Sequence, residues 1–289
     1  MPSHSTTVSA YAVLIGLLTA TPAGATPFSF NTGDPDGRMA TASRPSSGGK
    51  IEIESGDDFV LTARTAITSA TFTGLLTGNA NVGEVRVEIY RVFPNDSDTS
   101  RTPNVPTRVN SPSDVEFTDR DSAAGDLSFS TSVLAASFTT LNSVKPGGIH
   151  PLPNQTTGGD GPVTGEEVEF GVNFLRPFDL PADHYFFVPQ VEVMDPSGDF
   201  FWLSAPKPIV SPGTPFPAGF TDLQSWTRDD NLAPDWLRVG TDIIGGMPAP
   251  TFNATFSLTG AVPEPASLSL LALALTGLGV IRVRRSLPR

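Results

Sequence analysis

Alternation of apolar and polar residues is the feature of this sequence that most restricts its fold. In Glu84–Phe93 the alternation places Val85, Val87, Ile89 and Phe93 opposite Glu84, Arg86 and Glu88. The same period of two returns in Glu167–Phe174 and in Thr251–Thr259, where Phe256 falls on the apolar side and Ser257 on the polar side. Successive side chains of a β-strand point to opposite faces, so each segment is predicted to be a strand with one buried and one solvated face.

Further strands are predicted from short runs that are rich in β-branched and aromatic residues. They are Lys50–Glu54, Phe59–Thr65, Ala70–Leu76, Leu127–Leu134, Tyr185–Val193 and Phe200–Ser204. The 27 glycines and 28 prolines of the chain favour many turns between short elements over long helices. The predicted fold is all-β: a single antiparallel β-sandwich of jelly-roll type over residues 26–261.

Turns and long loops are predicted between these strands. Asp34–Gly37 and Asp195–Gly198 both read Asp-Pro-x-Gly, which is typical of a type I turn. Pro94–Asp126, Asn142–Glu166 and Ala205–Asp235 lack strand signals. Loops of that length are uncommon unless they bind a ligand or stay mobile. These three segments are therefore predicted to be loops with one of those two properties.

Both ends of the chain carry targeting patterns. Val8–Leu18 is an apolar run followed by Ala23-Gly24-Ala25, which predicts a signal peptide over residues 1–25 and cleavage by signal peptidase after Ala25. No Lys or Arg precedes the run, and an N-terminal strand or core helix is the alternative. At the other end a motif of Val262, Pro263, Glu264 and Pro265 precedes the uncharged segment 266–281 and a basic tail, 282–289. This segment is predicted to be a membrane helix, with Arg282, Arg284 and Arg285 as the cytoplasmic stop-transfer signal.

The C-terminal arrangement resembles the PEP-CTERM sorting signal of Gram-negative bacteria, which also combines Pro-Glu-Pro, a helix and an arginine cluster. The resemblance implies that an exosortase recognises and cleaves the tail. It also implies passage through the inner membrane and periplasm to the cell surface or the extracellular space, and an association with exopolysaccharide. An ordinary tail anchor is the alternative, because a helix followed by arginines is sufficient for anchoring.

The exported part is strongly acidic and has no cysteine. Residues 26–265 contain all 30 acidic residues and 14 of the 18 basic ones, a net charge of −16, because four arginines lie beyond Pro265. This charge repels phosphate backbones, so nucleic acid is excluded as a partner. With no cysteine the domain forms no disulfide, and its stability must come from the core or from bound ions.

Catalytic chemistry is not indicated. His150 and His184 are the only histidines beyond the signal peptide and are interpreted as loop or surface residues, and no Gly-x-Ser-x-Gly elbow or zinc-ligand spacing occurs. Ser47 and Lys50 match Ser-x-x-Lys, but the two intervening glycines disfavour the helix that this pair requires. The acidic doublets are interpreted as solvated faces, since neighbours in a strand point apart; they are Asp57-Asp58, Glu166-Glu167 and Asp229-Asp230.

Two sets of residues are candidates for ligand binding. Asp34, Asp36, Asp57 and Asp58 could supply oxygen ligands to calcium, the metal best suited to loops rich in carboxylates, although no cofactor is required. Trp202, Trp226 and Trp236 could stack on sugar rings if they are exposed. The sequence therefore predicts a non-enzymatic surface or extracellular-matrix protein with a structural or glycan-associated role. A glycoside hydrolase or lyase and a calcium-stabilised adhesin are the alternatives.

Overall fold

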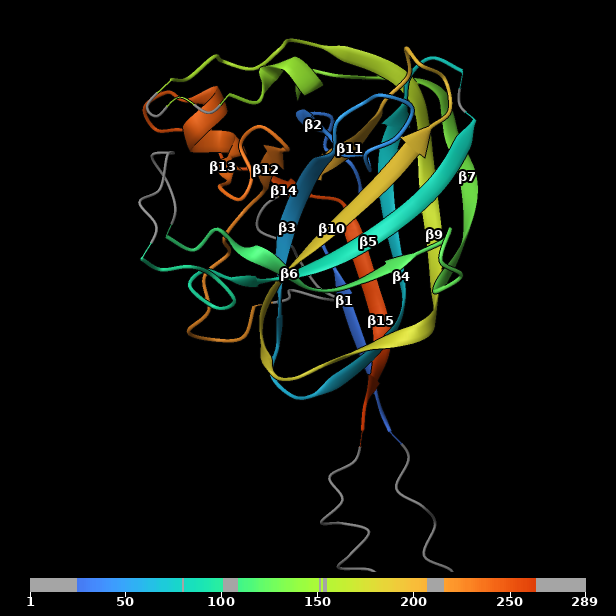
Figure 1. The fold of residues 1–289 in the computed structure, drawn as a ribbon, viewed down its shortest axis with the longest axis vertical. Helices are drawn as coiled ribbons and strands as arrows, with labels where there is room; N and C mark the ends of the chain where they lie inside the picture. The colour runs from blue at the N-terminus through green and yellow to red at the C-terminus, as the bar shows by residue number, and fades with distance from the viewer. Residues whose placement is uncertain are drawn as a thin grey trace, which may run out of the picture. The chain divides into compact units, whose positions relative to one another are not determined.

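Among the residues that the structure describes, the regular structure is almost entirely β-strand. The computed structural model describes residues 25–79, 81–100, 109–150, 152, 155–206 and 216–263. Within these ranges the strands form two sheets (Figure 1), and Thr26–Pro263 packs as one unit. The all-β prediction is confirmed, whereas the jelly-roll type of the sandwich stays a prediction.

The smaller sheet has six strands in the order β13-β12-β3-β10-β5-β6. Their bounds are β3 (Ile53–Leu61), β5 (Val82–Val92), β6 (Pro112–Asp121), β10 (Asp183–Val193), β12 (Trp226–Asp229) and β13 (Leu237–Arg238). All of its pairings are antiparallel. The sheet therefore brings β12 and β13, which are late in the chain, beside the early strand β3.

The larger sheet has nine strands, with β1-β15-β4-β11-β2-β8 as its main path and β9 joining β4 to β7. Their bounds are β1 (Thr26–Asn31), β2 (Met39–Ala42), β4 (Thr65–Leu76), β7 (Leu127–Thr140), β8 (Asn142–Val144), β9 (Val163–Leu180), β11 (Phe200–Ala205), β14 (Asn253–Ala254) and β15 (Phe256–Val262). The strands β2 and β8 run parallel, so the prediction of purely antiparallel pairing is wrong there. A short 3₁₀ turn, η1 (Pro146–Gly148), and a π-helical turn, η2 (Val239–Ile244), complete the described elements.

Phenylalanine rings from both sheets form the main core. Phe187 of β10 stacks on Phe256 of β15 with ring centroids 5.0 Å apart, and Phe72 of β4 stacks on Phe170 of β9 at the same separation. Val85, Val87 and Ile89 point into this core, as the alternation predicted. Stacked and edge-on aromatic pairs add to the burial energy of the rings, so this layer holds the two sheets together.

The predicted long loops are partly strands. β6, β8 and β12 lie inside the three segments interpreted as loops, and β1 and β2 were also missed. These strands are short or carry many polar residues, so their own sequence signal is weak. Pairing with strands far away in the sequence fixes their extended conformation. For example, β12 pairs with β3, where Arg228 lies opposite Glu54.

Several side chains on predicted solvated faces are buried. Glu88, Asn253 and Thr255 are each at most 3% exposed. The reason at Glu88 is a second layer on the outer face of the six-stranded sheet, where Leu223, Trp226 and Trp236 pack over Tyr90 and its neighbours. One face of the six-stranded sheet is therefore covered by the main core, and part of the other face by this second layer.

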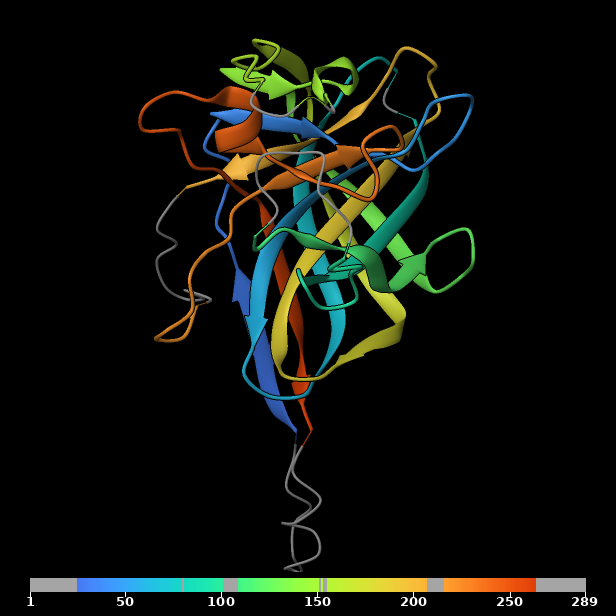
Figure 2. The ribbon, with the colours of Figure 1, turned by 60° about the vertical axis from the view of Figure 1, so that its left-hand side comes forward.

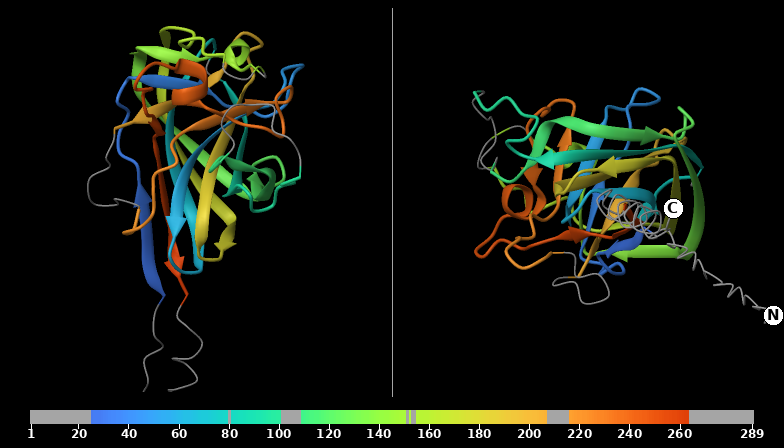
Figure 3. Two further views of the ribbon diagram at one scale, coloured as in Figure 1. Left: turned by 90° about the vertical axis from the view of Figure 1, so that its left-hand side faces the viewer. Right: turned by 90° about the horizontal axis from the view of Figure 1, so that it is seen from below.

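The two ends of the described domain lie side by side. β1 pairs with β15 in an antiparallel register that sets Thr26 opposite Val262 (Figures 2 and 3). Thr26 is also the residue that signal cleavage is predicted to expose, and Val262 is the last residue of β15. Both predicted processing positions therefore adjoin one end of the same sheet.

Candidate functional site

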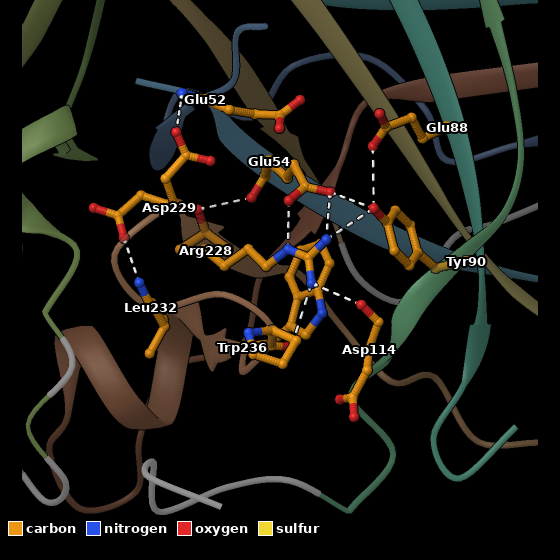
Figure 4. Close-up of polar contacts among 12 residues, drawn as sticks. Glu52, Glu54, Glu88, Tyr90, Asp114, Arg228, Asp229, Leu232 and Trp236 are labelled. Carbon is orange, nitrogen blue, oxygen red and sulfur yellow. Dashed lines mark hydrogen bonds and ion pairs between the residues drawn. The ribbon is translucent and has the colours of Figure 1, made fainter. Parts of the chain in front are cut away.

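A buried cluster of charged residues lies on the outer face of the six-stranded sheet (Figure 4). Its centre is Arg228 of β12, facing Glu54 of β3 and Tyr90 of β5, with Glu88 two residues before Tyr90. The alternation of β5 places Glu88 and Tyr90 on the face opposite Val87 and Ile89. The cluster therefore occupies the face that the sequence predicted to be wet.

Arg228 is held by several hydrogen bonds from all three of its guanidinium nitrogens. Its Nε and Nη2 donate to the two carboxylate oxygens of Glu54, the second at 2.9 Å, and Nη2 also donates to the hydroxyl of Tyr90 at 2.8 Å. Its Nη1 lies 3.3 Å from the backbone carbonyls of Asp114 and Pro234. A bidentate arginine–carboxylate pair is strong and directional, so it fixes the position of β12 on β3.

Aromatic rings complete the surroundings of Arg228. The guanidinium carbon lies 4.3 Å from the ring centroid of Trp236 and 5.1 Å from that of Tyr90. The Trp236 indole donates to the carbonyl of Ser113 at 3.2 Å, and the Tyr90 hydroxyl donates to Glu54 at 2.6 Å. Cation–π contacts strengthen when the cation is desolvated, as it is here.

The cluster contains more acids than bases, and burial changes their ionisation. Burial, and then the negative charges of Glu54 and Glu52, raise the pKa of Glu88 well above its usual range. Burial and the charge of Glu54 likewise raise the pKa of Glu52. Burial lowers the pKa of Arg228, but Glu54 and Tyr90 outweigh it and the net shift is upward. The arginine therefore stays charged, while Glu88, which lies 3.3 Å from the guanidinium of Arg86, ionises less readily than a free carboxyl group.

This cluster was not found from the sequence. Glu54, Tyr90 and Arg228 were not candidates, although the alternation did set Glu88 apart from the core side of its strand. The arrangement is internally satisfied, because Arg228 donates to groups of the chain itself. Its function is to attach the segment that contains β12 and Trp236 to the sheet.

Removing the Arg228 side chain should destabilise the fold, since it would leave the Glu54 carboxylate buried without its arginine partner. Arg228→Ala is expected to lower the free energy of unfolding by about 3–5 kcal/mol in chemical denaturation. The matched control is Arg64→Ala, which breaks the surface pair with Asp179, whose side chains are 69% and 49% exposed. That variant should show little change. Equal destabilisation by the two substitutions would contradict the role assigned to Arg228.

The four candidate calcium ligands are not brought together. Asp57 and Asp58 point to opposite sides of β3: Asp57 accepts the backbone N–H of Ala254 at 2.7 Å, and Asp58 accepts that of Leu223 at 3.0 Å. Asp36 accepts from the backbone of Arg38, and Asp34 is exposed. Within the described ranges no group of three or more His, Asp or Glu side chains is placed to hold a metal ion. The predicted calcium site is therefore wrong as a single site.

Several residues interpreted as solvated are buried. Four acids of these doublets are buried, so the interpretation is wrong for Asp57, Asp58, Glu167 and Asp229, whereas Asp230 is exposed as predicted. Asp229 accepts the backbone N–H of Leu232 at 2.9 Å. His184 is largely buried and its Nε2 bonds the carboxylate of Asp58, whose pKa is raised by burial. Asp57, Asp58 and Asp229 are structural anchors for neighbouring backbone, and only His150 has the predicted loop position.

The three tryptophans are inside the domain. Trp202, Trp226 and Trp236 are 1%, 0% and 2% exposed, because the main core and the outer layer enclose them. A buried ring offers no face to a sugar, so the prediction of an exposed tryptophan platform is wrong. Each indole N–H is bonded to a backbone carbonyl, as in the Trp202 bond to Thr255 at 2.8 Å.

A shallow groove on the outer face of the nine-stranded sheet is the other candidate site. We call it the hydroxyl groove; its lining residues are Ser69, Ala70, Thr71, Ser130, Gly171, Val172, Asn173, Ser257 and Thr259. No lining residue carries a charge, and adjacent strands link their hydroxyls, as Thr71 and Ser257 do at 2.6 Å. Gly171 keeps the groove open, because a Cβ there would lie 3.3 Å from the hydroxyl of Ser130. Hydroxyl and amide groups can both donate and accept hydrogen bonds, which suits a neutral polyhydroxyl ligand.

The sorting motif adjoins β15. A family model described as the PEP-CTERM protein-sorting motif matches residues 261–285. The match contains Val262, Pro263, Glu264, Pro265 and the arginines at 282, 284 and 285. The chain therefore carries a PEP-CTERM sorting signal, which supports an exported protein that is sorted to the cell surface by an exosortase. Neither the curated proteins nor the solved structures include a match to the chain.

Several targeting predictions lie outside the described residues. They are the signal peptide with Ala23, the helix 266–281, and the residues from Glu264 onward, including Arg282, Arg284 and Arg285. Between Ala25 and Pro263, in the parts that the structure describes, no helix is long and apolar enough to span a membrane. The signal-peptide cleavage after Ala25 and the membrane helix stay predictions.

Proposed function

We infer that this chain is a non-enzymatic protein of the cell surface or extracellular matrix, with a structural or glycan-associated role. The observation that carries this proposal is the PEP-CTERM signal, which begins within the last two residues of the last strand of a folded, acidic domain. Signal peptidase, exosortase and an extracellular polysaccharide are its proposed partners. The membrane contacts the protein through the C-terminal helix before processing, and the mature domain is then at the surface or outside the cell.

The arrangement of the ends supports this path. Because Thr26 lies opposite Val262, both processing positions adjoin one end of the sheet. Cleavage after Ala25 and cleavage near Pro263 would then leave the core intact, since both lie outside the Phe-rich layer. A domain tethered at this end would present its other surfaces away from the membrane.

The hydroxyl groove supports the glycan-associated role. It is uncharged within a domain of net charge −16, so a neutral polysaccharide could approach it without desolvating a carboxylate. Among the acids of the buried charge cluster, Glu54 pairs with Arg228, whereas Glu52 and Glu88 pair with Arg86. This pairing supports the non-enzymatic proposal, because buried, paired carboxylates are poorly placed to act on a sugar.

Binding to polysaccharide is the test of this proposal. The domain Thr26–Pro263 should bind the neutral exopolysaccharide of its host in a glycan array, with and without a chelator, and release no sugar ends. Gly171→Leu, which fills the hydroxyl groove, should weaken binding at least tenfold, while Thr62→Leu on the exposed β3–β4 connection should not. Loss of binding with chelator would favour the calcium adhesin, and new reducing or unsaturated ends would favour the hydrolase or lyase.

A further inference from the structure

Strand β7 forms an open edge of the nine-stranded sheet. Among the described residues it pairs with β9 alone, and Figure 1 shows it at the right-hand border of the domain. No backbone hydrogen bond of Leu127–Val133 occurs outside the β7–β9 ladder within this described part of the chain. The outward N–H and C=O groups of the strand are therefore available to another strand.

The first half of this edge, Leu127–Val133, lacks the usual protection against pairing. The sequence of β7, LSFSTSVLAASFTT, contains no charged residue and no proline. Val133 and Leu134 are 58% and 53% exposed. Natural edge strands commonly carry lysine, proline or a bulge that prevents association. Register shifts begin only after Val133, which leaves Leu127–Val133 as a regular open edge.

The regular part of this edge is self-complementary. An antiparallel pairing of two copies about a two-fold axis at Ser130 sets Ser128 of one copy opposite Ser132 of the other. It also sets Phe129 opposite Thr131, and Leu127 opposite Val133. Serine hydroxyls then meet on one face and apolar or threonine side chains on the other, which are favourable cross-strand pairs.

Charge favours a second copy at this edge. Residues 26–265 have a net charge of −16, so most contacts between two copies bring carboxylates together. β7 is a fourteen-residue strand without a charge, so pairing of two copies along it sets no carboxylates directly opposite each other; Glu167 and Glu169 lie one strand away on β9.

We propose that two copies of this chain associate through antiparallel pairing of their β7 strands, centred on Ser130. The two nine-stranded sheets become one continuous sheet. The two-fold axis is perpendicular to that sheet, so the hydroxyl grooves of both copies lie on the same face. The partner is a second copy of the chain, and the contact is mainly backbone hydrogen bonding of the edge.

Single cysteines test this pairing, because the chain has no cysteine of its own. At the two-fold axis the paired Cα atoms should be about 4.5–5.5 Å apart, within the range of a disulfide. Under mild oxidation, Ser130→Cys in the domain Thr26–Pro263 should form a covalent dimer at least tenfold faster than Ser132→Cys. The Ser132 variant faces residue 128 of the second copy and is the register control. Equal rates for the two variants would overturn the proposal.

A charge at the axis gives an independent measurement. In sedimentation, the unmodified domain should double its mass as concentration rises, whereas Ser130→Lys should stay monomeric with an unchanged thermal midpoint. Lysines directly opposite each other repel, and lysine is a natural protector of edges. If the unmodified domain remains monomeric up to about 100 µM, its self-association is weaker than a typical specific contact. That result would overturn the proposal. If Ser130→Lys does not fold, the cysteine variants decide the question.

Discussion

Replacing Glu264 by alanine should block processing of the tail while leaving membrane insertion intact. A plain anchor needs only an apolar helix and a basic end, and nothing in that role requires a carboxylate between two prolines. Because proline fixes its own φ and restricts the residue before it, the sequence Pro263-Glu264-Pro265 predicts a stiff backbone on which an exosortase can recognise the carboxylate of Glu264. We therefore expect full-length Glu264→Ala protein to accumulate in the inner membrane of an exosortase-bearing host.

Fractionation with antibodies to the domain measures this effect. The released or surface form should fall at least tenfold, and the retained form should resist carbonate extraction. Glu264→Gln tests whether the charge itself is read, and Ser267→Ala, three residues further on, is the matched control that should be processed normally. The same accumulation is expected for the unmodified protein in a host without the exosortase. Normal display of Glu264→Ala would show that the tail is an ordinary anchor.

Phe256→Asp should abolish the fold of the domain. Phe256 is buried, stacks on Phe187 at 5.0 Å, and also packs against Phe30 at 5.0 Å and Trp202 at 5.8 Å. The substitution removes a core ring, at about 3–5 kcal/mol, and buries an unpaired carboxylate, which costs several more. That sum equals most or all of the stability of a typical domain, about 5–15 kcal/mol, so we expect the variant to be unfolded.

Ser257→Asp is the matched control, since it lies on the next residue of the same strand. Ser257 faces the hydroxyl groove, where solvent can hydrate a carboxylate, so this variant should keep a cooperative thermal transition by circular dichroism. Phe256→Leu keeps an apolar side chain and should fold with a lowered midpoint. Similar midpoints for Phe256→Asp and Ser257→Asp would mean that the two faces of β15 are assigned the wrong way round.

The core was predictable because alternation is a local property. Val85, Val87 and Ile89 are buried where the period of two placed them, and β5, β10 and β11 lie close to their predicted ranges. The weak strands were not predictable. β12 has four residues and is defined by its pairing with β3, more than 160 positions earlier in the chain.

The buried charge cluster shows why the site was missed. The alternation indicates that Glu88 and Val87 lie on opposite faces, but it does not indicate whether the face of Glu88 is exposed to solvent. That depends on the segment carrying Trp226 and Trp236, which the tertiary structure lays over Tyr90. The same covering layer explains why those two tryptophans cannot serve as an exposed sugar platform.

Local patterns were sufficient to predict the all-β class, the inward faces of the main strands and the sorting signal, because each depends on residues close together in the chain. Three features became visible only in the folded protein: which polar faces are covered, which acids pair with Arg228 and His184, and the open edge at β7. Those outcomes depend on contacts between segments far apart in sequence. Short-range patterns contain no information on which distant segment lies over a given face, and only the folded chain supplies it.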